Sequence, residues 1–326
     1  MLCLYNDNTN PYFNLALEEY ILKEFEDDCF MLWRNSPCIV VGKNQNTLSE
    51  INLEYVNKNS IPVVRRLSGG GAVFHDLGNL NFTFIINDNG DSFNNYRKFT
   101  EPIIEVLQKL NVNAELSGRN DLVIDGKKFS GNAQVKYKNR ILHHGTLLFS
   151  ANVSDISSAL ISKPIKFEDK SVKSISSRVT NISEHINKPL DILEFKDLIM
   201  NNIMEKHNEF TFYSLSGNDV NKVNRLVYEK YSTWEWNFGE SPQYNFRNQM
   251  RFSGGLVEVN IIVDKGILKN IKIYGDFFSK CDIADIENAL VNVKHNKDDI
   301  KKVLSKFNIE DYFSNISLND LINIFF

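Results

Sequence analysis

The sequence has few cysteines and no long apolar run, and each of these absences excludes a class of protein. The four cysteines, Cys3, Cys29, Cys38 and Cys281, include no CxxC pair, so they support neither a disulfide framework nor a structural zinc site. We interpret them as buried free thiols. No stretch approaches the roughly 20 apolar residues of a membrane span, and residues 1–7 contain no basic segment that leads into an apolar run. We therefore expect a cytoplasmic protein without a membrane partner.

An excess of positive charge is also missing. The chain has 37 basic and 41 acidic residues, which argues against a broad surface for nucleic acid, so any phosphate should be bound locally. Hydrophobic residues make up 42% and charged residues 24% of the 326 residues, as in ordinary folded proteins. This length favours two domains.

Short strand-like runs alternate with helical segments along the chain. Asn10 and Pro11 open a helix whose apolar residues have helical spacing, and residues 30–33 and 38–41 suggest a hairpin. The other expected strands are 62–66, 81–86, 122–124, 128–129, 133–135, 145–149, 256–263 and 267–274, and the other expected helices are 96–110, 190–205, 218–231, 283–291, 298–307 and 318–325. Strands in blocks with helices between them predict an α+β fold with a mixed or antiparallel sheet.

Two irregular segments divide the pattern. Residues 162–180 are rich in Ser and Lys and indicate a long surface loop, a class of loop that often serves as a lid. Residues 237–248 are polar and contain proline, and we interpret them as a linker. The expected domains are therefore 1–246 and a small α+β unit, 247–326, in which Asp264-Lys265-Gly266 marks a hairpin.

The densest candidate for a site is a glycine-rich turn. It reads Arg65-Arg66-Leu67-Ser68-Gly69-Gly70-Gly71-Ala72-Val73-Phe74-His75-Asp76. Three successive glycines let backbone N–H groups approach a ligand, and the two arginines are available for anionic oxygens. The motif is neither GxxxxGK[ST] nor GxGxxG, and a turn beside two surface arginines is the structural alternative.

Two further clusters carry polar groups suited to phosphate. Ser117-Gly118-Arg119-Asn120-Asp121 supplies a cation, an amide and a carboxylate; the lone Asp121 suffices for Mg²⁺ bound together with phosphate, and an Asx-type turn is the alternative. Asp125-Gly126-Lys127-Lys128 places paired lysines after a tight turn, where alternation sends only one of them inward. An inward lysine would steady a carboxylate that attacks phosphorus. His143-His144 lacks the spacing of a zincin and favours structural histidines.

These motifs, in this order, closely resemble the lipoate–protein ligase A family of the biotin/lipoate ligase fold group, over nearly the whole chain. The matching segments are Asn10-Pro11-Tyr12-Phe13-Asn14-Leu15-Ala16, Leu32-Trp33-Arg34-Asn35, residues 66–78, 117–122, 128–131 and 143–148, Ser177-Arg178-Val179-Thr180-Asn181 and Trp234-Glu235-Trp236-Asn237-Phe238-Gly239. The resemblance implies a catalytic domain of this type, with a mixed sheet, and a C-terminal accessory domain as found in ligases that perform both steps.

The resemblance also implies a reaction and a set of residues. Lipoate and ATP would give lipoyl-adenylate and pyrophosphate, and a lysine of an acceptor would then take the lipoyl group as an amide. Lys128 would contact the lipoate carboxyl and the adenylate phosphate, Trp33 would wall the lipoyl tunnel, and Asn120 and Asp121 would face phosphate and Mg²⁺. The remaining substrate contacts expected from the matching motifs are Arg66, Ser68, Gly69, Gly70, Gly71, Ala72, His75, Gly131, His144, Gly145, Arg178 and Thr180. Apo lipoyl domains of oxo-acid dehydrogenase complexes or the glycine cleavage H protein are the expected acceptors.

Two other functions are weighed against this one. A lipoyl or octanoyl transferase of the same fold uses a cysteine beyond the His-Gly strand, and no cysteine occurs between Cys38 and Cys281. A binding protein without activity would sequester lipoate or nucleotide, or would bind nucleic acid through the Arg65-Arg66 and Lys127-Lys128 pairs. The excess of acidic residues in the chain argues against nucleic-acid binding.

Overall fold

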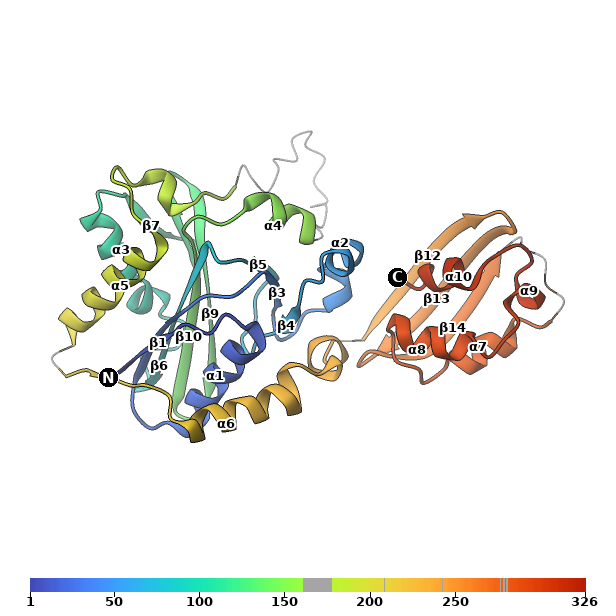
Figure 1. Cartoon of the computed structure of the whole chain (residues 1–326), viewed down its shortest axis with the longest axis horizontal. Helices are drawn as coiled ribbons and strands as arrows, with labels where there is room; N and C mark the ends of the chain where they lie inside the picture. The colour runs from blue at the N-terminus through green and yellow to red at the C-terminus, as the bar shows by residue number, and fades with distance from the viewer. Residues whose placement is uncertain (161–177, 208, 242, 276, 278, 280) are drawn as a thin grey trace. The chain divides into compact units, whose positions relative to one another are not determined.

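The protein forms two compact units, residues Met1–Thr233 and Trp234–Phe326. The computed structural model describes residues 1–160, 178–207, 209–241, 243–275, 277, 279 and 281–326. The first unit combines an eight-stranded mixed sheet, a three-stranded sheet and helices, and the second has a three-stranded antiparallel sheet and helices (Figure 1). The predicted α+β class is therefore confirmed. The division between the units precedes the boundary expected at 246/247.

The large sheet of the first unit combines four consecutive strands, β7 to β10 (residues 114–148), with strands that are distant in sequence. Its elements are β1 (Leu2–Asn6), α1 (Pro11–Glu24), β2 (Cys29–Trp33), β3 (Cys38–Val41), η1 (Thr47–Ser49), α2 (Leu53–Lys58), β4 (Val63–Arg65), β5 (Val73–His75), β6 (Asn79–Asn87), α3 (Tyr96–Lys109), β7 (Ala114–Ser117), β8 (Asp121–Ile124), β9 (Lys127–Tyr137), β10 (Arg140–Leu148), α4 (Val153–Ala159), η3 (Ile182–His185), α5 (Ile192–Lys206), β11 (Thr211–Phe212), α6 (Gly217–Leu226) and η4 (Val227–Tyr231). The large sheet has the order β11-β1-β2-β6-β10-β9-β8-β7 and the small one β4-β3-β5.

Strand β6 lies inside the large sheet and separates two environments. Leu80, Phe82 and Phe84 point to one face, where they join the apolar core formed with α3 and α5. Because side chains alternate along a strand, Asn81 and Thr83 point to the opposite face, toward α1. Figure 1 shows α3 and α5 together on one side of the sheet and α1 on the other.

Helix α1 begins where the sequence predicts. The Asn10 side chain accepts hydrogen bonds from the backbone N–H groups of Tyr12 and Phe13, and Pro11 occupies the first turn, where no N–H donor is needed. The helix also buries two adjacent carboxylates, Glu18 and Glu19. Buried charges need partners, so both side chains must be paired.

The hairpin predicted for residues 30–33 and 38–41 is wrong. Strand β2 pairs with β1 and β6 in the large sheet, whereas β3 pairs with β4 and β5 in the small sheet. Every residue of β2 and β3 is buried. Apolar, β-prone residues mark both segments as strands, but the partner of each strand is supplied by distant segments.

Other expectations for the first unit are refined. The strands expected at 128–129 and 133–135 are one continuous strand, β9, and β5 was not predicted. The long loop expected at 162–180 falls mostly on residues outside those described, with only residues 178–180 in view. Cys3, Cys29 and Cys38 are buried and free as predicted, whereas Cys281 is exposed, so the prediction of a buried thiol there is wrong.

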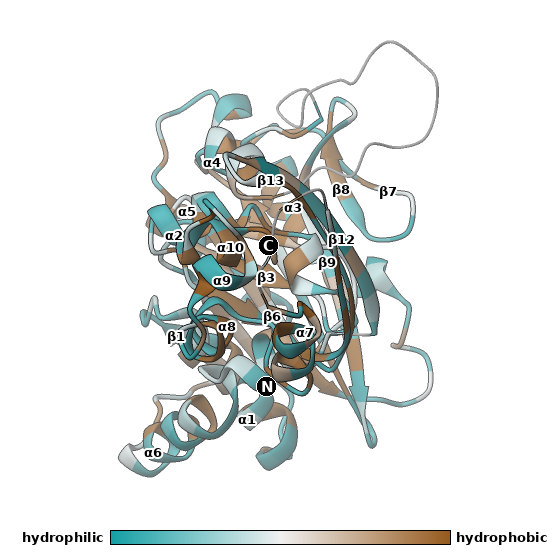
Figure 2. Ribbon diagram, turned by 90° about the vertical axis from the view of Figure 1, so that its right-hand side faces the viewer, coloured by the Kyte–Doolittle hydropathy of each residue, from teal (hydrophilic) through white to brown (hydrophobic). Residues whose placement is uncertain are grey.

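The second unit places helices against one face of a small sheet. Its elements are η5 (Glu235–Gly239), β12 (Tyr244–Phe252), β13 (Gly255–Asp264), β14 (Ile267–Gly275), α7 (Ala284–Leu290), α8 (Lys297–Leu304), α9 (Ile309–Tyr312) and α10 (Leu318–Asn323). Alternate residues of β13, such as Val257, Val259 and Ile261, form its core with the helices, while β12 carries many hydrophilic residues (Figure 2).

One prediction for this unit is confirmed and one is wrong. Lys265 and Gly266 both have positive φ, 49° and 69°, as a two-residue hairpin turn between β13 and β14 requires. The segment 237–248, predicted as a linker, instead contains the end of η5 and the start of β12. Trp234 packs on the hairpin turn, since a Cβ at Gly266 would lie 2.5 Å from its indole ring.

In the described ranges no helix has the length and apolar character needed to cross a membrane.

Candidate active site

A cavity of about 250 Å³ in the first unit brings together most of the residues selected from the sequence. Its walls come from α1, α4, both sheets and the glycine-rich turn. The predicted residues that line it are Trp33, Arg66, Gly70, Gly71, Ala72, His75, Asn120, Lys128, Gly131, His144 and Gly145. The predicted residues outside the lining are Ser68, Gly69, Asp121, Arg178 and Thr180, and each of them contacts a lining residue.

A β-bulge sets the direction of Lys128. Leu122 pairs with Ser130 and Val123 pairs with Lys128, so Phe129 is an extra residue on β9. Phe129 is fully buried in the apolar core, while the Lys128 side chain extends over Gly131, where an added Cβ would lie 3.1 Å from Nζ. Lys127, the preceding residue on β9, is exposed. The bulge therefore turns the ammonium group of Lys128 into the cavity.

Three of the predicted residues that do not line the cavity are contact partners of Lys128. Its Nζ lies 2.7 Å from Oδ1 of Asp121, in an ion pair that is partly exposed on both sides. Its backbone N–H donates to the carbonyl of Arg178 at 2.9 Å, and its carbonyl accepts from the N–H of Thr180 at 3.0 Å. Arg178 and Thr180 thus fix the backbone of Lys128 through their own backbone groups.

Arg66 shapes the glycine-rich turn from within. Its guanidinium donates to the carbonyl oxygens of Gly69 and Gly71, both at 2.8 Å, and its Nε donates to Oγ of Ser68 at 3.1 Å. Burial lowers the pKa of Arg66 to about 10, partly opposed by the charge of Glu18, so the side chain stays protonated at neutral pH. These hydrogen bonds hold the loop whose backbone lines the cavity.

The prediction that both arginines are available for anionic oxygens is wrong for Arg65. Its guanidinium is fully buried and donates to the carbonyl oxygens of Gly42, Lys43 and Gln45 at 2.8–3.0 Å. Buried guanidinium groups need such acceptors, and here they tie the turn after β3 to β4.

Two glycines are required by the geometry of the cavity. Gly70 has φ of 98°, a conformation that side chains disfavour. A Cβ at Gly145 would lie 2.2 Å from Oδ1 of Asn132 and 2.5 Å from the ring of Phe82. Asn132 is held in turn by Asn120, whose Nδ2 donates to its carbonyl at 2.7 Å. Gly145 therefore lets the side chain of Asn132 approach the sheet.

A buried polar network converges on Glu18. The indole N–H of Trp33 donates to Oγ1 of Thr83 at 2.8 Å, and the Thr83 hydroxyl donates to the Glu18 carboxylate at 2.7 Å. On the other side Nδ1 of His144 lies 3.0 Å from Glu18, and Nε2 lies 2.6 Å from Oγ of Ser68. A carboxylate only accepts hydrogen bonds, so Nδ1–H of His144 donates to Glu18, while Nε2 contacts the Ser68 hydroxyl.

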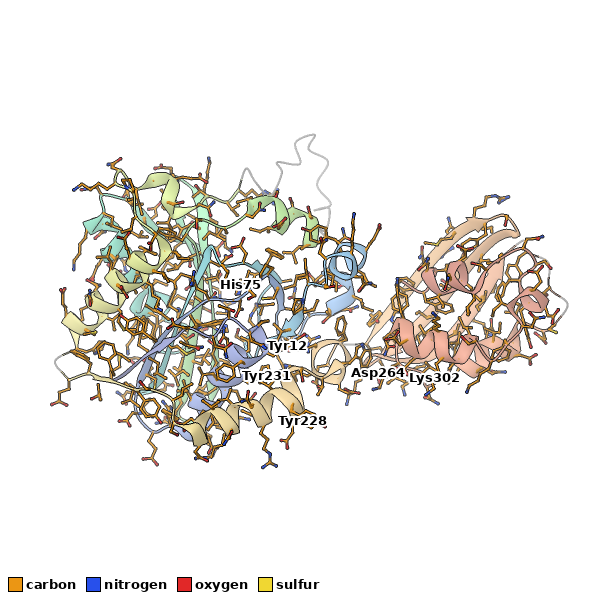
Figure 3. The ribbon with its side chains drawn as sticks, in the orientation of Figure 1. Tyr12, His75, Tyr228, Tyr231, Asp264 and Lys302 are labelled. Atoms are coloured by element: carbon orange, nitrogen blue, oxygen red, sulfur yellow. The ribbon has the colours of Figure 1, made fainter. Side chains whose placement is uncertain are left out.

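A second polar chain runs through His75, which Figure 3 shows inside the first unit. Nδ2 of Asn35 contacts Nδ1 of His75 at 3.1 Å, Nε2 contacts Oγ1 of Thr146 at 2.9 Å, and the Thr146 hydroxyl donates to Oδ1 of Asn81 at 2.9 Å. Burial, with the nearby charges of Arg66 and His144, lowers the pKa of His75 to about 3. His75 is therefore neutral at physiological pH and carries its proton on Nε2.

The sequence analysis missed several residues of this site. Glu18, Asn81 and Thr83 are buried, Thr146 is half-buried, and all four belong to the two polar networks. Leu15 adds an apolar part of the lining. A signal was present for two of them, since Asn81 and Thr83 recur at every second position of an otherwise apolar strand. Polar side chains on one face of a buried strand need polar partners.

Metal ligands are not clustered in the part of the chain that the structure describes, where no group of three or more His, Cys, Asp or Glu side chains is placed to hold an ion. His143 stacks on the ring of Phe99, with centroids 4.5 Å apart, and burial holds its pKa well below the usual range. His143 is thus structural, as predicted, whereas His144 faces the cavity.

Comparisons with known protein families match both units. A family model described as the lipoyl protein ligase A/B catalytic domain matches residues 10–204, and one described as the bacterial lipoate protein ligase C-terminus matches residues 241–325. Lipoate–protein ligase 1 of Staphylococcus aureus is 46% identical over 98% of both chains. Lipoate-protein ligase LplJ of Bacillus subtilis is 45% identical over the full length of both.

Solved structures of lipoate ligases resemble this fold. A lipoate-protein ligase A bound with ATP has a TM-score of 0.64 and 27% identity, covering 73% of this chain and 98% of its own. LipL1 of P. falciparum in complex with lipoate has a TM-score of 0.62 and 28% identity, covering 99% and 97%. A bipartite ligase from Thermoplasma acidophilum, described with its E2 lipoyl domain, has a TM-score of 0.66 and 29% identity, covering 74% and 97%. The chain belongs to the lipoate–protein ligase family and carries both its catalytic domain and its C-terminal domain.

Proposed function

We propose that this chain activates lipoate with ATP and then transfers the lipoyl group to a lysine of an acceptor protein. The observation that carries the proposal is the cavity, which joins an apolar wall, including Leu15, Trp33 and Val40, to the glycine-rich turn and to the ammonium group of Lys128. An apolar acyl chain fits the first part, and its carboxylate and the phosphates of a nucleotide fit the second. The ligases bound with ATP and with lipoate support this assignment.

In the first step, the lipoate carboxylate attacks the α-phosphorus of ATP, a new P–O bond forms and pyrophosphate leaves. Lys128 lies on the cavity wall, where its positive charge would orient the carboxylate and stabilise the negative charge that develops on the phosphate oxygens. The backbone N–H groups of the turn at Gly70 and Gly71 would contact the phosphates, as three small residues in a row allow.

In the second step, the neutral amine of the acceptor lysine attacks the carbonyl carbon of lipoyl-adenylate. The C–N bond forms, AMP leaves with the electrons of the C–O bond, and the amine gives up a proton. Lys128 would remain paired with the phosphate of the leaving AMP, which lowers the energy of that departure. A cavity closed over the adenylate would also protect the anhydride from water.

Asp121 is the residue that would hold Mg²⁺ together with the phosphates of ATP. Magnesium commonly takes one or two protein carboxylates and completes its shell with phosphate and water, so a single aspartate fits it. Asp121 lies 2.7 Å from Lys128, at the edge of the cavity, and is partly exposed. The ion would supply positive charge beside the phosphates and shift Asp121 from its pairing with Lys128.

The acceptors that we propose are apo lipoyl domains of oxo-acid dehydrogenase complexes or the glycine cleavage H protein, in the cytoplasm. The Thermoplasma acidophilum ligase described with its E2 lipoyl domain supports the first of these. The free thiols of Cys3, Cys29 and Cys38 suit a reducing compartment.

A transferase that forms a thioester lacks its nucleophile in this cavity. Among the residues that the structure describes, no cysteine lines the cavity, and Cys38, on strand β3, is fully buried. Burial raises the pKa of Cys38 far above its usual range, and burial raises that of Cys29 to about 12, so neither forms a thiolate at neutral pH.

The test combines the full chain with ATP, Mg²⁺, lipoate and an apo lipoyl domain and follows the mass of the acceptor. We expect the acceptor to gain one lipoyl group only when ATP is present, and we expect ATP–pyrophosphate exchange that requires lipoate. Synthetic lipoyl-AMP, supplied without ATP, should also modify the acceptor. An acceptor that is modified by lipoyl-AMP but never by lipoate and ATP would contradict the first step.

A further inference from the structure

The polar chain through His75 ends at a hydrogen-bond donor that no described residue uses. Asn81 is 1% exposed and lines the cavity, its Oδ1 accepts from the Thr146 hydroxyl, and its Nδ2 has no partner among the described residues. Unpartnered buried donors are rare because each costs free energy. A donor held this way on a cavity wall points to an acceptor on the bound substrate.

The orientation of the Asn81 amide follows from the chain itself. Nδ2 of Asn14 faces the backbone carbonyls of Asn8 and Arg34 at 2.9 and 3.0 Å, and it also faces Oδ1 of Asn35 at 2.8 Å. Backbone carbonyls only accept, so Asn14 must present its NH₂ group there, and Asn35 must present its oxygen to Asn14.

The remaining links then have one direction. Asn35 presents its NH₂ group to Nδ1 of His75, so the neutral ring carries its proton on Nε2 and donates to Thr146. The Thr146 hydroxyl has one proton, which goes to Asn81, and only the oxygen of that amide can accept it. The NH₂ group of Asn81 is therefore the free end of a chain that begins at fixed backbone carbonyls.

The sheet register places this donor in line with the cation of the site. Asn81 pairs with Thr146, and Thr146 pairs with Gly131, the residue over which the Lys128 side chain extends. Neighbouring strands lie about 4.8 Å apart, so the Cα atoms of Asn81 and Gly131 are separated by about 10 Å. Side chains that enter the cavity from both ends of this row can contact the two oxygens of one carboxyl group.

We propose that Asn81 is a substrate-binding residue whose Nδ2 donates a hydrogen bond to an acyl oxygen: a carboxylate oxygen of the free acid, and the carbonyl oxygen of the adenylate. The inference rests on the proposed function and adds a neutral, directional donor to the charge of Lys128. Sulfur is a weak hydrogen-bond acceptor, so the dithiolane ring would compensate poorly for the free-energy cost of burying this amide N–H group. Asn81 therefore binds the acid group of the substrate and not its dithiolane ring.

The test compares Asn81→Asp with Asn79→Asp in the full chain. Aspartate at position 81 keeps an oxygen for the Thr146 hydroxyl and replaces the free donor by an acceptor, which repels the acyl oxygen. Asn79 is the matched control, because it lies two residues away on the same face of β6, is fully buried, and also has an unpartnered Nδ2, but does not line the cavity. The measurement is the Kd for lipoate and for octanoate by calorimetry.

We expect Asn81→Asp to weaken the binding of both acids by roughly 10- to 100-fold, as the loss of a hydrogen bond to a charged group predicts. Asn79→Asp should stay within about twofold of the wild type, as expected for a site without contact to the ligand. Unchanged binding of both acids by Asn81→Asp, or a loss confined to lipoate, would overturn the inference. Wild-type protein that binds neither acid would instead refute the proposed function itself.

A second pair of variants serves if Asn81→Asp fails to fold. Thr146→Val removes the hydroxyl that orients Asn81, and Thr146→Ser retains it, so a merely steric role for Thr146 would affect both. We expect Thr146→Val to weaken lipoate binding by roughly 3- to 10-fold, about the worth of one neutral hydrogen bond, and Thr146→Ser to restore it. Equal affinities in Thr146→Val and wild type would contradict the inference.

Discussion

Strand β6 sends apolar side chains to one face of the large sheet and polar side chains to the other, and the two faces have different chemistry. On the helix face, Phe82 and Phe84 pack with α3 and α5 in a closed core. On the cavity face, Asn81 and Thr83 enter hydrogen-bonded chains that end at the cavity wall. Both faces are fully buried, so burial alone does not distinguish a core from a site; the hydrogen-bond partners do.

The difference also appears in the two adjacent histidines of β10. His143 points to the helix face, where it stacks on Phe99, and His144 points to the cavity, where it contacts Glu18 and Ser68. Adjacent residues of a strand point to opposite faces, so one of these histidines packs in the core while the other lines the cavity. Substitutions on the helix face should therefore change stability, and those on the cavity face should change activity.

The largest effect on the cavity face should come from Lys128→Ala. We propose that its ammonium group stabilises charge on the phosphate, so its removal should lower kcat/KM for lipoylation by roughly 10²- to 10³-fold, while the melting temperature stays close to wild type. Lys127→Ala is the matched control, since Lys127 is the neighbouring lysine on β9, is exposed and does not line the cavity. Equal losses from both lysines would contradict the geometry of the bulge.

On the helix face, Phe99→Ala should have the opposite profile. Phe99 is 2% exposed and contacts the rings of Phe84 and His143, so its loss should reduce the free energy of unfolding by about 3–5 kcal/mol. Urea unfolding followed by circular dichroism measures this change. The activity per folded molecule should be unchanged, and Phe93→Ala, at a residue that is 44% exposed, serves as the control.

Acidification should also act on the helix face. Burial lowers the pKa of His143, so below about pH 6.5 the unfolded chain binds a proton that the native state excludes. The free energy of unfolding should therefore fall with decreasing pH, by up to about 1.4 kcal/mol per pH unit for this residue. His143→Phe should reduce that slope in urea titrations at pH 7, 6 and 5, and the remaining slope should come from other buried histidines with a lowered pKa, such as His75. An identical slope in the variant would show that other groups carry the acid sensitivity.

The smallest change in stability should come from Asp121→Asn at the edge of the cavity. Its ion pair with Lys128 is partly exposed, so breaking the pair should alter the free energy of unfolding by less than about 1 kcal/mol. The KM for ATP should nevertheless rise, with a greater need for Mg²⁺, if Asp121 holds the ion. A steady-state titration of Mg²⁺ at fixed ATP measures this effect, and an unchanged Mg²⁺ requirement would count against the assignment.

Local signals in the sequence determined a large part of the fold. The Asn10 cap, the turn at Asp125-Gly126, where both residues have positive φ, and the turn at Lys265-Gly266 are each set by the residues at that point. Such features depend on neighbours within a few positions, so composition and spacing are enough to predict them. Most of the residues selected from the motifs in the glycine-rich turn and around Lys128 likewise lie on the cavity wall.

Only the tertiary structure decided how these pieces meet. The partners of β2 and β3 and the chain from Asn14 to Asn81 depend on pairings between segments far apart in the sequence. The bulge that directs Lys128 into the cavity lies in the local hairpin of β8 and β9, but the cavity that it faces is completed by distant strands. A strand can form similar backbone hydrogen bonds with many partners, so its local residues do not identify the right one. The sequence identified many of the polar and glycine residues that line the cavity, and strand pairing decided which of their side chains face it, because that direction depends on register and on neighbouring strands.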